Sequence, residues 1–135
     1  MNVFDEVLQF NLVRRLIEKG YNESKEVSFI LEELTEGLRA NDKEEKVDAY
    51  CDVIVFAIGA IYKLGYDAEL SMQEVCKHIN SEVGGGYDAE QGKYLKGQRH
   101  YFPDFSKAKI WKKKWFVFIS ISSISHTRTI TRLSI

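Results

Sequence analysis

Five acidic residues in the first half of the chain have types and spacings that suit a metal site or acid–base chemistry. Glu32, Glu33 and Glu36 form an E-E-x-x-E pattern, and Asp48 and Asp52 follow at a spacing of four. On a helix, residues three or four apart share a face, so each group of carboxylates gathers on one side of its helix. Carboxylate oxygens are the ligands that hard divalent cations prefer. The pattern therefore predicts a Mg²⁺ site, with Mn²⁺ as the alternative ion.

The segment between the two acidic groups is short enough to be a turn between antiparallel helices. Asn41 and Asp42 carry the turn chemistry. Because a helix rises 1.5 Å per residue, positions equally distant from residue 42 face each other. Glu36 then lies level with about residue 48, and Glu32 or Glu33 with about residue 52. Carboxylates this close raise one another's pKa, and a bound cation removes the repulsion. A solvated acidic helix face is the alternative interpretation.

Apolar spacing and capping residues predict four helices to carry these side chains. Gly20 and Gly65 are placed to end the first and third of them, and Ser71 with Glu74 matches a capping box that opens the fourth. The predicted helices cover residues 3–18, from Asn22 or Ser24 to about 40, from about 44 to 64, and from Ser71 to about 81. Short connections between them favour an all-α bundle.

The third predicted helix is apolar nearly all round between Val53 and Ile61. Such a helix is buried on most sides. Four helices in one small chain rarely enclose a central helix, so we expect a second copy of the chain to complete the bundle. Phe10 and Tyr21 are expected in the core, with stacking on a nucleotide base as the alternative.

Composition limits the classes of protein that the chain can belong to. With 135 residues it is long enough for one domain. All 20 acidic residues lie in 1–104 with 12 of the 19 Lys and Arg, so this part has a net charge of −8, which argues against binding a nucleic-acid polymer. The longest apolar run, 53–62, is half the length of a membrane span.

The cysteines and the N-terminus point to a compartment. Cys51 and Cys76 have no C-x-x-C spacing, and we expect two buried, reduced thiols of a cytoplasmic protein. The N-terminal residues do not have the pattern of a secretory signal.

Residues 110–135 form a tail that differs from the rest of the chain. It begins with Lys112, Lys113 and Lys114 and continues as an Ile/Ser/Thr-rich run without acids, a composition that favours strand. Three interpretations stay open: a strand that pairs with its copy in another subunit, a disordered, aggregation-prone tail, or an extraneous extension. The abrupt change in composition favours the last. The predicted domain is therefore 1–109.

Residues 28–80 resemble the all-α nucleoside triphosphate pyrophosphohydrolases, which include the MazG-like proteins, the dimeric dUTPases and the dCTPase-like enzymes. That superfamily carries E-E-x-x-E on one helix and E-x-x-D on the next. Glu32, Glu33 and Glu36 match the first motif, and Asp52 matches the Asp of the second. Ala49 stands where the second motif has Glu, while Asp48 lies one residue earlier. Residues 80–104 are similar to the C-terminal part of phage-type MazG-like proteins.

The resemblance implies a MazG-like bundle of four main helices completed in a homodimer or homotetramer. It implies Mg²⁺-dependent hydrolysis of a ribo- or deoxyribonucleoside triphosphate to the monophosphate and pyrophosphate. The resemblance implies that Glu33, Glu36 and Asp52 hold the metal and leaves Glu32 as the catalytic base. Asp48 is either a further metal ligand or an acceptor that supports one. For the substrate, Lys93 is a candidate phosphate contact or a solvated lysine, and Asn80 binds the base or caps its helix.

Two other functions stay open. The Ala49 departure is compatible with a catalytically degenerate nucleotide-binding or interaction module of the same fold. A hydrolase acting on another phosphorylated metabolite, such as phosphoribosyl-ATP, would use the same acids. The sequence does not select a base or sugar.

Overall fold

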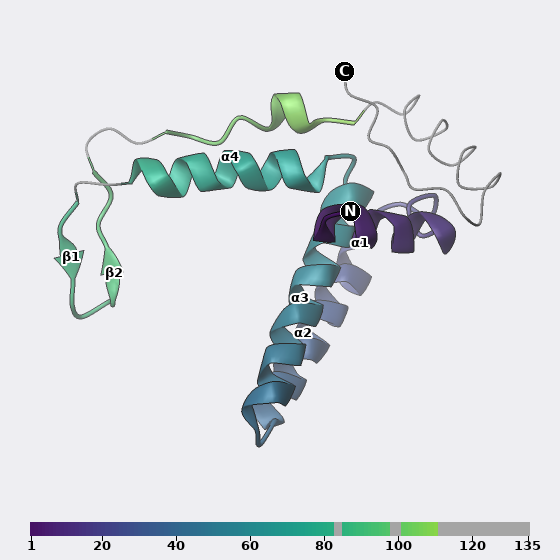
Figure 1. Cartoon of the computed structure of the whole chain (residues 1–135), viewed down its shortest axis with the longest axis horizontal. Helices are drawn as coiled ribbons and strands as arrows, with labels where there is room; N and C mark the ends of the chain where they lie inside the picture. Colours follow the sequence, from purple (N-terminus) through teal and green to yellow (C-terminus); the bar gives the residue numbers. More distant parts are fainter. Residues whose placement is uncertain (83–84, 98–100, 111–135) are drawn as a thin grey trace. The chain divides into compact units, whose positions relative to one another are not determined.

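The computed structural model describes residues 1–82, 85–97 and 101–110, and over these residues the chain is predominantly helical (Figure 1). The elements are α1 (Val3–Val13), α2 (Glu23–Arg39), α3 (Lys43–Lys63), α4 (Ala68–Ser81), the two-residue strands β1 (Tyr87–Asp88) and β2 (Lys93–Tyr94), and the 3₁₀ helix η1 (Phe105–Ala108). The predicted all-α class is confirmed at this level. Of the tail predicted from residue 110 onward, only Ile110 lies among the described residues.

The described residues fall into two compact units. Met1–Tyr66 hold α1, α2 and α3, and Asp67–Lys109 hold α4, the β1–β2 hairpin and η1. No helix in the described ranges combines the length and apolar character that crossing a membrane requires.

Helix α1 is shorter than the periodicity of its sequence predicts. It ends at Val13, whereas the apolar spacing continues to residue 18. The cause is Arg15, which adopts a left-handed backbone conformation with φ of 56°. This conformation lets the Leu16 N–H bond to the Asn11 carbonyl at 2.9 Å, closing the helix end as glycine usually does.

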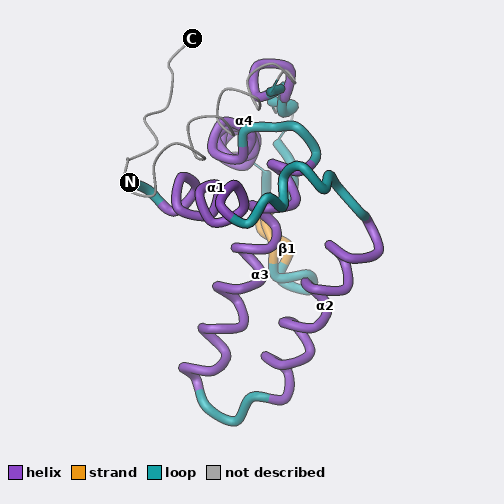
Figure 2. The backbone as a smooth tube through the Cα atoms, turned by 90° about the vertical axis from the view of Figure 1, so that its right-hand side faces the viewer, coloured by secondary structure: helices purple, strands orange, loops and turns teal. Residues whose placement is uncertain are grey.

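Helices α2 and α3 form an antiparallel hairpin and lie side by side over their length (Figures 1 and 2). Helix α2 begins at the predicted capping residue Asn22, and α3 is capped by Asp42, which was predicted only as part of the turn. The Asn22 side chain accepts from the Lys25 N–H at 3.1 Å, and the Asp42 side chain accepts from the Glu45 N–H at 2.8 Å. At the far end of α3, Gly65 takes a left-handed conformation with φ of 89°, as predicted from its position.

The core of the first unit lies where α1 crosses α3. Tyr62 is its most deeply buried large side chain, at 1% exposure. The Asn11 side chain of α1 packs against Gly59 of α3, where a Cβ would lie 3.2 Å from Asn11 Nδ2. The buried apolar side chains of α1 and α3 are Val7, Leu8, Leu12, Ala49, Ile58 and Tyr62.

Helix α4 of the second unit does not begin with the predicted capping box. The helix starts at Ala68, and Asp67 is the capping residue, accepting from the Leu70 N–H at 2.9 Å. Ser71 lies inside the first turn, where its hydroxyl donates to the Asp67 carbonyl at 2.7 Å. Glu74 is therefore free of a capping role.

Glu74 instead ties the segment before η1 to α4. Its carboxylate accepts from the Tyr101 hydroxyl, the Lys77 ammonium and, at 3.1 Å, the Asp104 N–H. These three donors, with the Lys77 bond the strongest influence, lower the pKa of Glu74 to about 2.

Several burial predictions are wrong. Cys51 and Cys76 are both exposed, as are Phe10 at 45% and Tyr21 at 38%. Each lies on a helix or connection with too few neighbours in one chain to cover it. Within α3, Ile54 is 54% exposed, so a single chain does not enclose that helix.

Candidate functional site

The five predicted acids all lie on the α2–α3 hairpin, within the first unit. Glu32, Glu33 and Glu36 belong to the middle of α2, and Asp48 and Asp52 to the first half of α3. The antiparallel pairing of the two helices (Figure 2) turns a sequence separation of 12 to 20 residues into proximity.

Glu33 is the electrostatic centre of this group. The pKa of its carboxyl lies above the ordinary value, first because of partial burial and then because of repulsion from all four other acids. Those acids are, in order of decreasing effect, Asp52, Glu36, Glu32 and Asp48. Repulsion from both helices at one carboxyl means that the acids of α2 and α3 share an electrostatic environment.

Burial divides the acids into two kinds. Glu33 and Asp52 are half-buried, whereas Glu32, Glu36 and Asp48 are exposed. The half-buried pair therefore has the more restricted side chains, and the other three have solvent around them in which to change rotamer.

Ala49 does not lie on the acidic side of α3. It is buried at 7% exposure, and its Cβ lies 3.0 Å from the position that a Cβ on Gly37 would take. A Glu in place of Ala49 would be driven into this contact between the two helices. Asp48, which contributes to the raised pKa of Glu33, is thus the acid that α3 presents together with Asp52.

The acids match a hard cation in chemistry and are not gathered around a single point. All five offer carboxylate oxygens, which suit Mg²⁺ or Mn²⁺. Among the described residues, however, no three His, Cys, Asp or Glu side chains stand close enough together to hold a metal ion. Binding a cation would therefore require the exposed Glu32, Glu36 or Asp48 side chains to turn toward Glu33.

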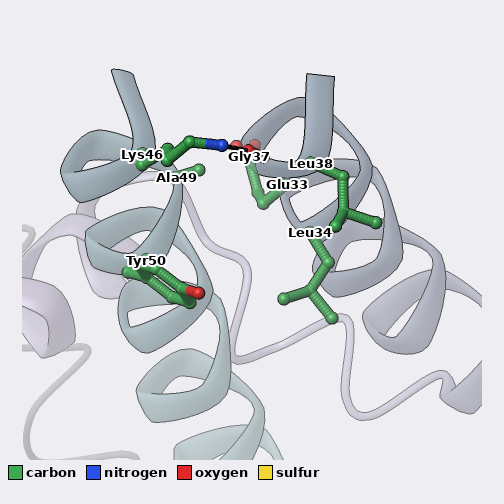
Figure 3. Close-up of a pocket in the computed structure, with 7 residues that line it drawn as sticks. All are labelled: Glu33, Leu34, Gly37, Leu38, Lys46, Ala49 and Tyr50. Atoms are coloured by element: carbon green, nitrogen blue, oxygen red, sulfur yellow. Dashed lines mark hydrogen bonds between the residues drawn. The ribbon is translucent and has the colours of Figure 1, made fainter. Parts of the chain in front are cut away.

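A pocket of about 270 Å³ opens beside Glu33 between α2 and α3 (Figure 3). Helix α2 contributes Glu33, Leu34, Gly37 and Leu38, and helix α3 contributes Lys46, Ala49 and Tyr50. Its surface is mostly apolar, and Glu33 and Lys46 are the two charged residues that line it.

Lys46 was not singled out by the sequence reasoning. Its ammonium donates to the Gly37 carbonyl at 3.0 Å, across the hairpin. Gly37 lies in the last turn of α2, where carbonyls have no intrahelical donor. A lysine placed a few residues after the turn is the signal that could have indicated this bond.

The two predicted substrate contacts belong to the second unit, whereas the acids belong to the first. Asn80 is exposed in the last turn of α4, and Lys93 is exposed on β2. Their role toward a substrate stays a prediction.

Comparison with known proteins yields no match, whether to a family model, to a curated protein or to a solved structure.

Proposed function

We propose that the chain is a Mg²⁺-dependent nucleoside triphosphate pyrophosphohydrolase, which cleaves a nucleotide to its monophosphate and pyrophosphate. The observation that carries the proposal is the α2–α3 hairpin, which brings acids of both helices into the electrostatic environment of the half-buried Glu33. Proteins avoid concentrating like charges on a half-buried carboxyl unless a cation or a reaction makes use of them. The resemblance of residues 28–80 to the all-α pyrophosphohydrolases supplies the reaction.

In this proposal Glu33, Glu36, Asp52 and Asp48 hold the metal, which when bound neutralises charge on the substrate phosphates. Glu32 orients the attacking water and accepts its proton. Its exposure gives it the access to solvent that this role needs. Asn80 and Lys93 contact the substrate.

The proposal includes a homodimer or homotetramer that completes a MazG-like bundle. Large apolar side chains on both helices of the hairpin are exposed, which supports an additional covering surface. The largest exposed fractions are Leu38 at 84%, Tyr50 at 66%, Val47 at 60% and Leu31 at 56%.

The proposal also includes a location in the cytoplasm. The exposed free thiols of Cys51 and Cys76 favour this reducing compartment.

The test is pyrophosphate release from a panel of ribo- and deoxyribonucleoside triphosphates, with Mg²⁺ and with EDTA. We expect Mg²⁺-dependent release from one or a few of them. Asp52→Asn should lower the rate of pyrophosphate release at least 100-fold, because a half-buried metal ligand would be lost. Glu44→Gln, which changes an exposed acid in the first turn of the same helix, is the matched control and should leave the rate unchanged.

A catalytically degenerate module of the same fold is the second candidate. The observation that favours it is the absence, in the described ranges, of three acids close enough to hold a metal. Nucleotide binding without pyrophosphate release, under conditions where Mn²⁺ does not bind, would select this alternative. Ala49→Glu is unsuitable as a gain-of-function test, because position 49 is buried against Gly37.

A further inference from the structure

Tyr101 is held on α4 through its N–H, its carbonyl and its hydroxyl. The N–H donates to Ser81 Oγ at 2.7 Å, the carbonyl contacts His78 Nδ1, and the hydroxyl donates to the Glu74 carboxylate. Glu74, His78 and Ser81 follow one another at spacings of four and three, so they lie along one face of the helix. The segment of residues 101–104, which leads into η1 beside α4 (Figure 1), is therefore fastened to the second half of that helix.

The imidazole ring of His78 lies between two groups that accept hydrogen bonds. Its Nδ1 contacts the Tyr101 carbonyl, and its Nε2 lies 3.2 Å from Glu82 Oε1. A carbonyl and an ionised carboxylate have no proton to donate. A neutral imidazole carries one N–H, whereas the imidazolium ion carries two. Only the protonated ring can therefore donate to both groups at once.

The other two fastenings of Tyr101 keep their protonation state near neutral pH. Hydrogen bonds, first from Lys77 and then from Tyr101, lower the pKa of Glu74 to about 2. The bond to Glu74 in turn raises the pKa of the Tyr101 hydroxyl. The Ser81 hydroxyl does not titrate. A change in this contact near neutral pH must therefore come from His78, whose side-chain type changes charge most readily in that range.

Charged groups surround the ring from α4 and from the segments on either side of it. Glu82 is in direct contact with the ring, and the Lys96 ammonium lies 3.8 Å from the same Glu82 oxygen. The Phe102 ring stacks on the imidazole with 6.4 Å between the ring centres. One helical turn away, the Glu74 carboxylate is occupied by Lys77, Tyr101 and the Asp104 N–H. Glu82 is thus the acid that favours the imidazolium ion most directly.

We propose that His78 is a pH-sensitive latch, which holds residues 101–104 on α4 while its imidazole is protonated and loosens that hold as the ring loses its proton. The deprotonated ring keeps one N–H, and a carboxylate is a stronger acceptor than a carbonyl. The remaining N–H therefore stays with Glu82, and the Tyr101 carbonyl loses its donor. The stabilisation is present at low pH and is lost as pH rises through the titration of His78. This inference does not depend on the proposed function.

The test is a pH titration of the isotopically labelled full-length chain by nuclear magnetic resonance. It covers about pH 5 to about pH 9, the range in which histidines titrate. The ring shifts of His78 report its protonation, and the hydrogen-exchange protection factor of the Tyr101 amide reports the contact with α4. We expect the two signals to change with the same midpoint. The protection factor should fall about threefold to tenfold as pH rises, the ratio that corresponds to one hydrogen bond.

Two variants and a control sharpen the test. In His78→Gln the side-chain amide does not titrate, so the Tyr101 protection factor should not depend on pH. Glu82→Gln removes the negative charge beside Nε2, so the midpoints of both signals should move together to lower pH by about half a unit or more. Glu90→Gln is the matched control, because it neutralises an exposed acid of the same unit, between β1 and β2, and it should leave both midpoints unchanged.

The latch is refuted if the Tyr101 protection factor stays constant while His78 titrates, or if its pH dependence persists in folded His78→Gln. If His78→Gln does not fold, Glu82→Gln decides between the outcomes. A parallel shift of both midpoints supports the latch, whereas a shift of the His78 midpoint that Tyr101 does not follow refutes it. Neither nucleotide nor metal enters the measurement, so the latch and the proposed function can fail separately.

Discussion

The ion pair between Glu26 and Lys63 connects the first turn of α2 to the last turn of α3. The Lys63 ammonium lies 2.6 Å from Glu26 Oε1, and the side chains are only 11% and 6% exposed. At an effective dielectric constant of 20, two unit charges at this separation attract by about 6 kcal/mol. Desolvation of both groups offsets much of this attraction.

The desolvation cost of the carboxylate is only partly compensated. Among the described residues, Glu26 Oε2 is the one buried side-chain oxygen or nitrogen without a hydrogen-bond partner. The pair is thus held by one short interaction, and the second oxygen remains desolvated without compensation. We therefore expect removal of either charge alone to destabilise the fold, and removal of both charges together to cost little stability.

The perturbation is therefore a double-mutant cycle. Glu26→Leu leaves a buried ammonium unpaired, Lys63→Met leaves a buried carboxylate unpaired, and each should cost about 3–5 kcal/mol in the free energy of unfolding. The double variant should have a free energy of unfolding close to that of the unsubstituted chain, or higher by about 1–4 kcal/mol.

Urea unfolding followed by circular dichroism at 222 nm measures all four corners of the cycle. The total stability of a domain is only about 5–15 kcal/mol, so either single variant should shift the midpoint strongly. The exposed pair of Arg15 and Glu18 provides the control, and Glu18→Gln should leave the midpoint unchanged. Losses below about 1 kcal/mol in both single variants, or a double variant less stable than either, would show that the two charges do not depend on each other.

Three further outcomes follow from charges and backbone geometry. Because the pKa of Glu33 is raised, repulsion between its carboxylate and the neighbouring acids is present above that pKa and relieved as pH falls. Glu33→Gln should therefore raise the melting temperature at pH 8 in EDTA, with no gain near pH 4. The control variant Glu44→Gln should not show this gain. Because the pKa of Glu74 is lowered to about 2, its contribution to stability is complete above the ordinary value of 4.5 and is lost as pH falls toward 2. An acid titration followed by the near-ultraviolet dichroism of tyrosine should show this loss. In Glu74→Leu the acid transition should be absent, because Tyr101 is already released. Arg15→Gly should raise the melting temperature by about 2–4 °C, because glycine adopts a positive φ without strain, and a scanning calorimetry trace that shows a decrease would contradict this.

Local chemistry made the α2–α3 hairpin predictable from sequence. Asn22 and Asp42 cap the two helices as their types suggest, and Gly65 ends α3 in the conformation that glycine favours. The spacing of the acids then required only helix geometry to bring Glu33 toward Asp52.

Features that depend on the rest of the fold were not predictable in this way. Arginine carries no local signal for the left-handed conformation that Arg15 adopts, so the end of α1 was misplaced. Ser71 and Glu74 matched a capping box, but Asp67 caps α4 while Glu74 anchors Tyr101, 27 residues later. Periodicity alone also cannot state which apolar residues one chain leaves uncovered, as Cys51 and Phe10 show.

The neighbouring positions 48 and 49, occupied by Asp and Ala, link the packing of the hairpin to its chemistry. A helix presents residues 48 and 52 along one line, whereas residue 49 is turned by about 100° toward the neighbouring helix. With a small residue at 49, α2 and α3 come together at Gly37, and the acids of both helices act on Glu33. A large side chain at 49 would part the helices even if it were acidic. Position 49 thus provides a close helix contact, and Asp48 provides the neighbouring carboxylate.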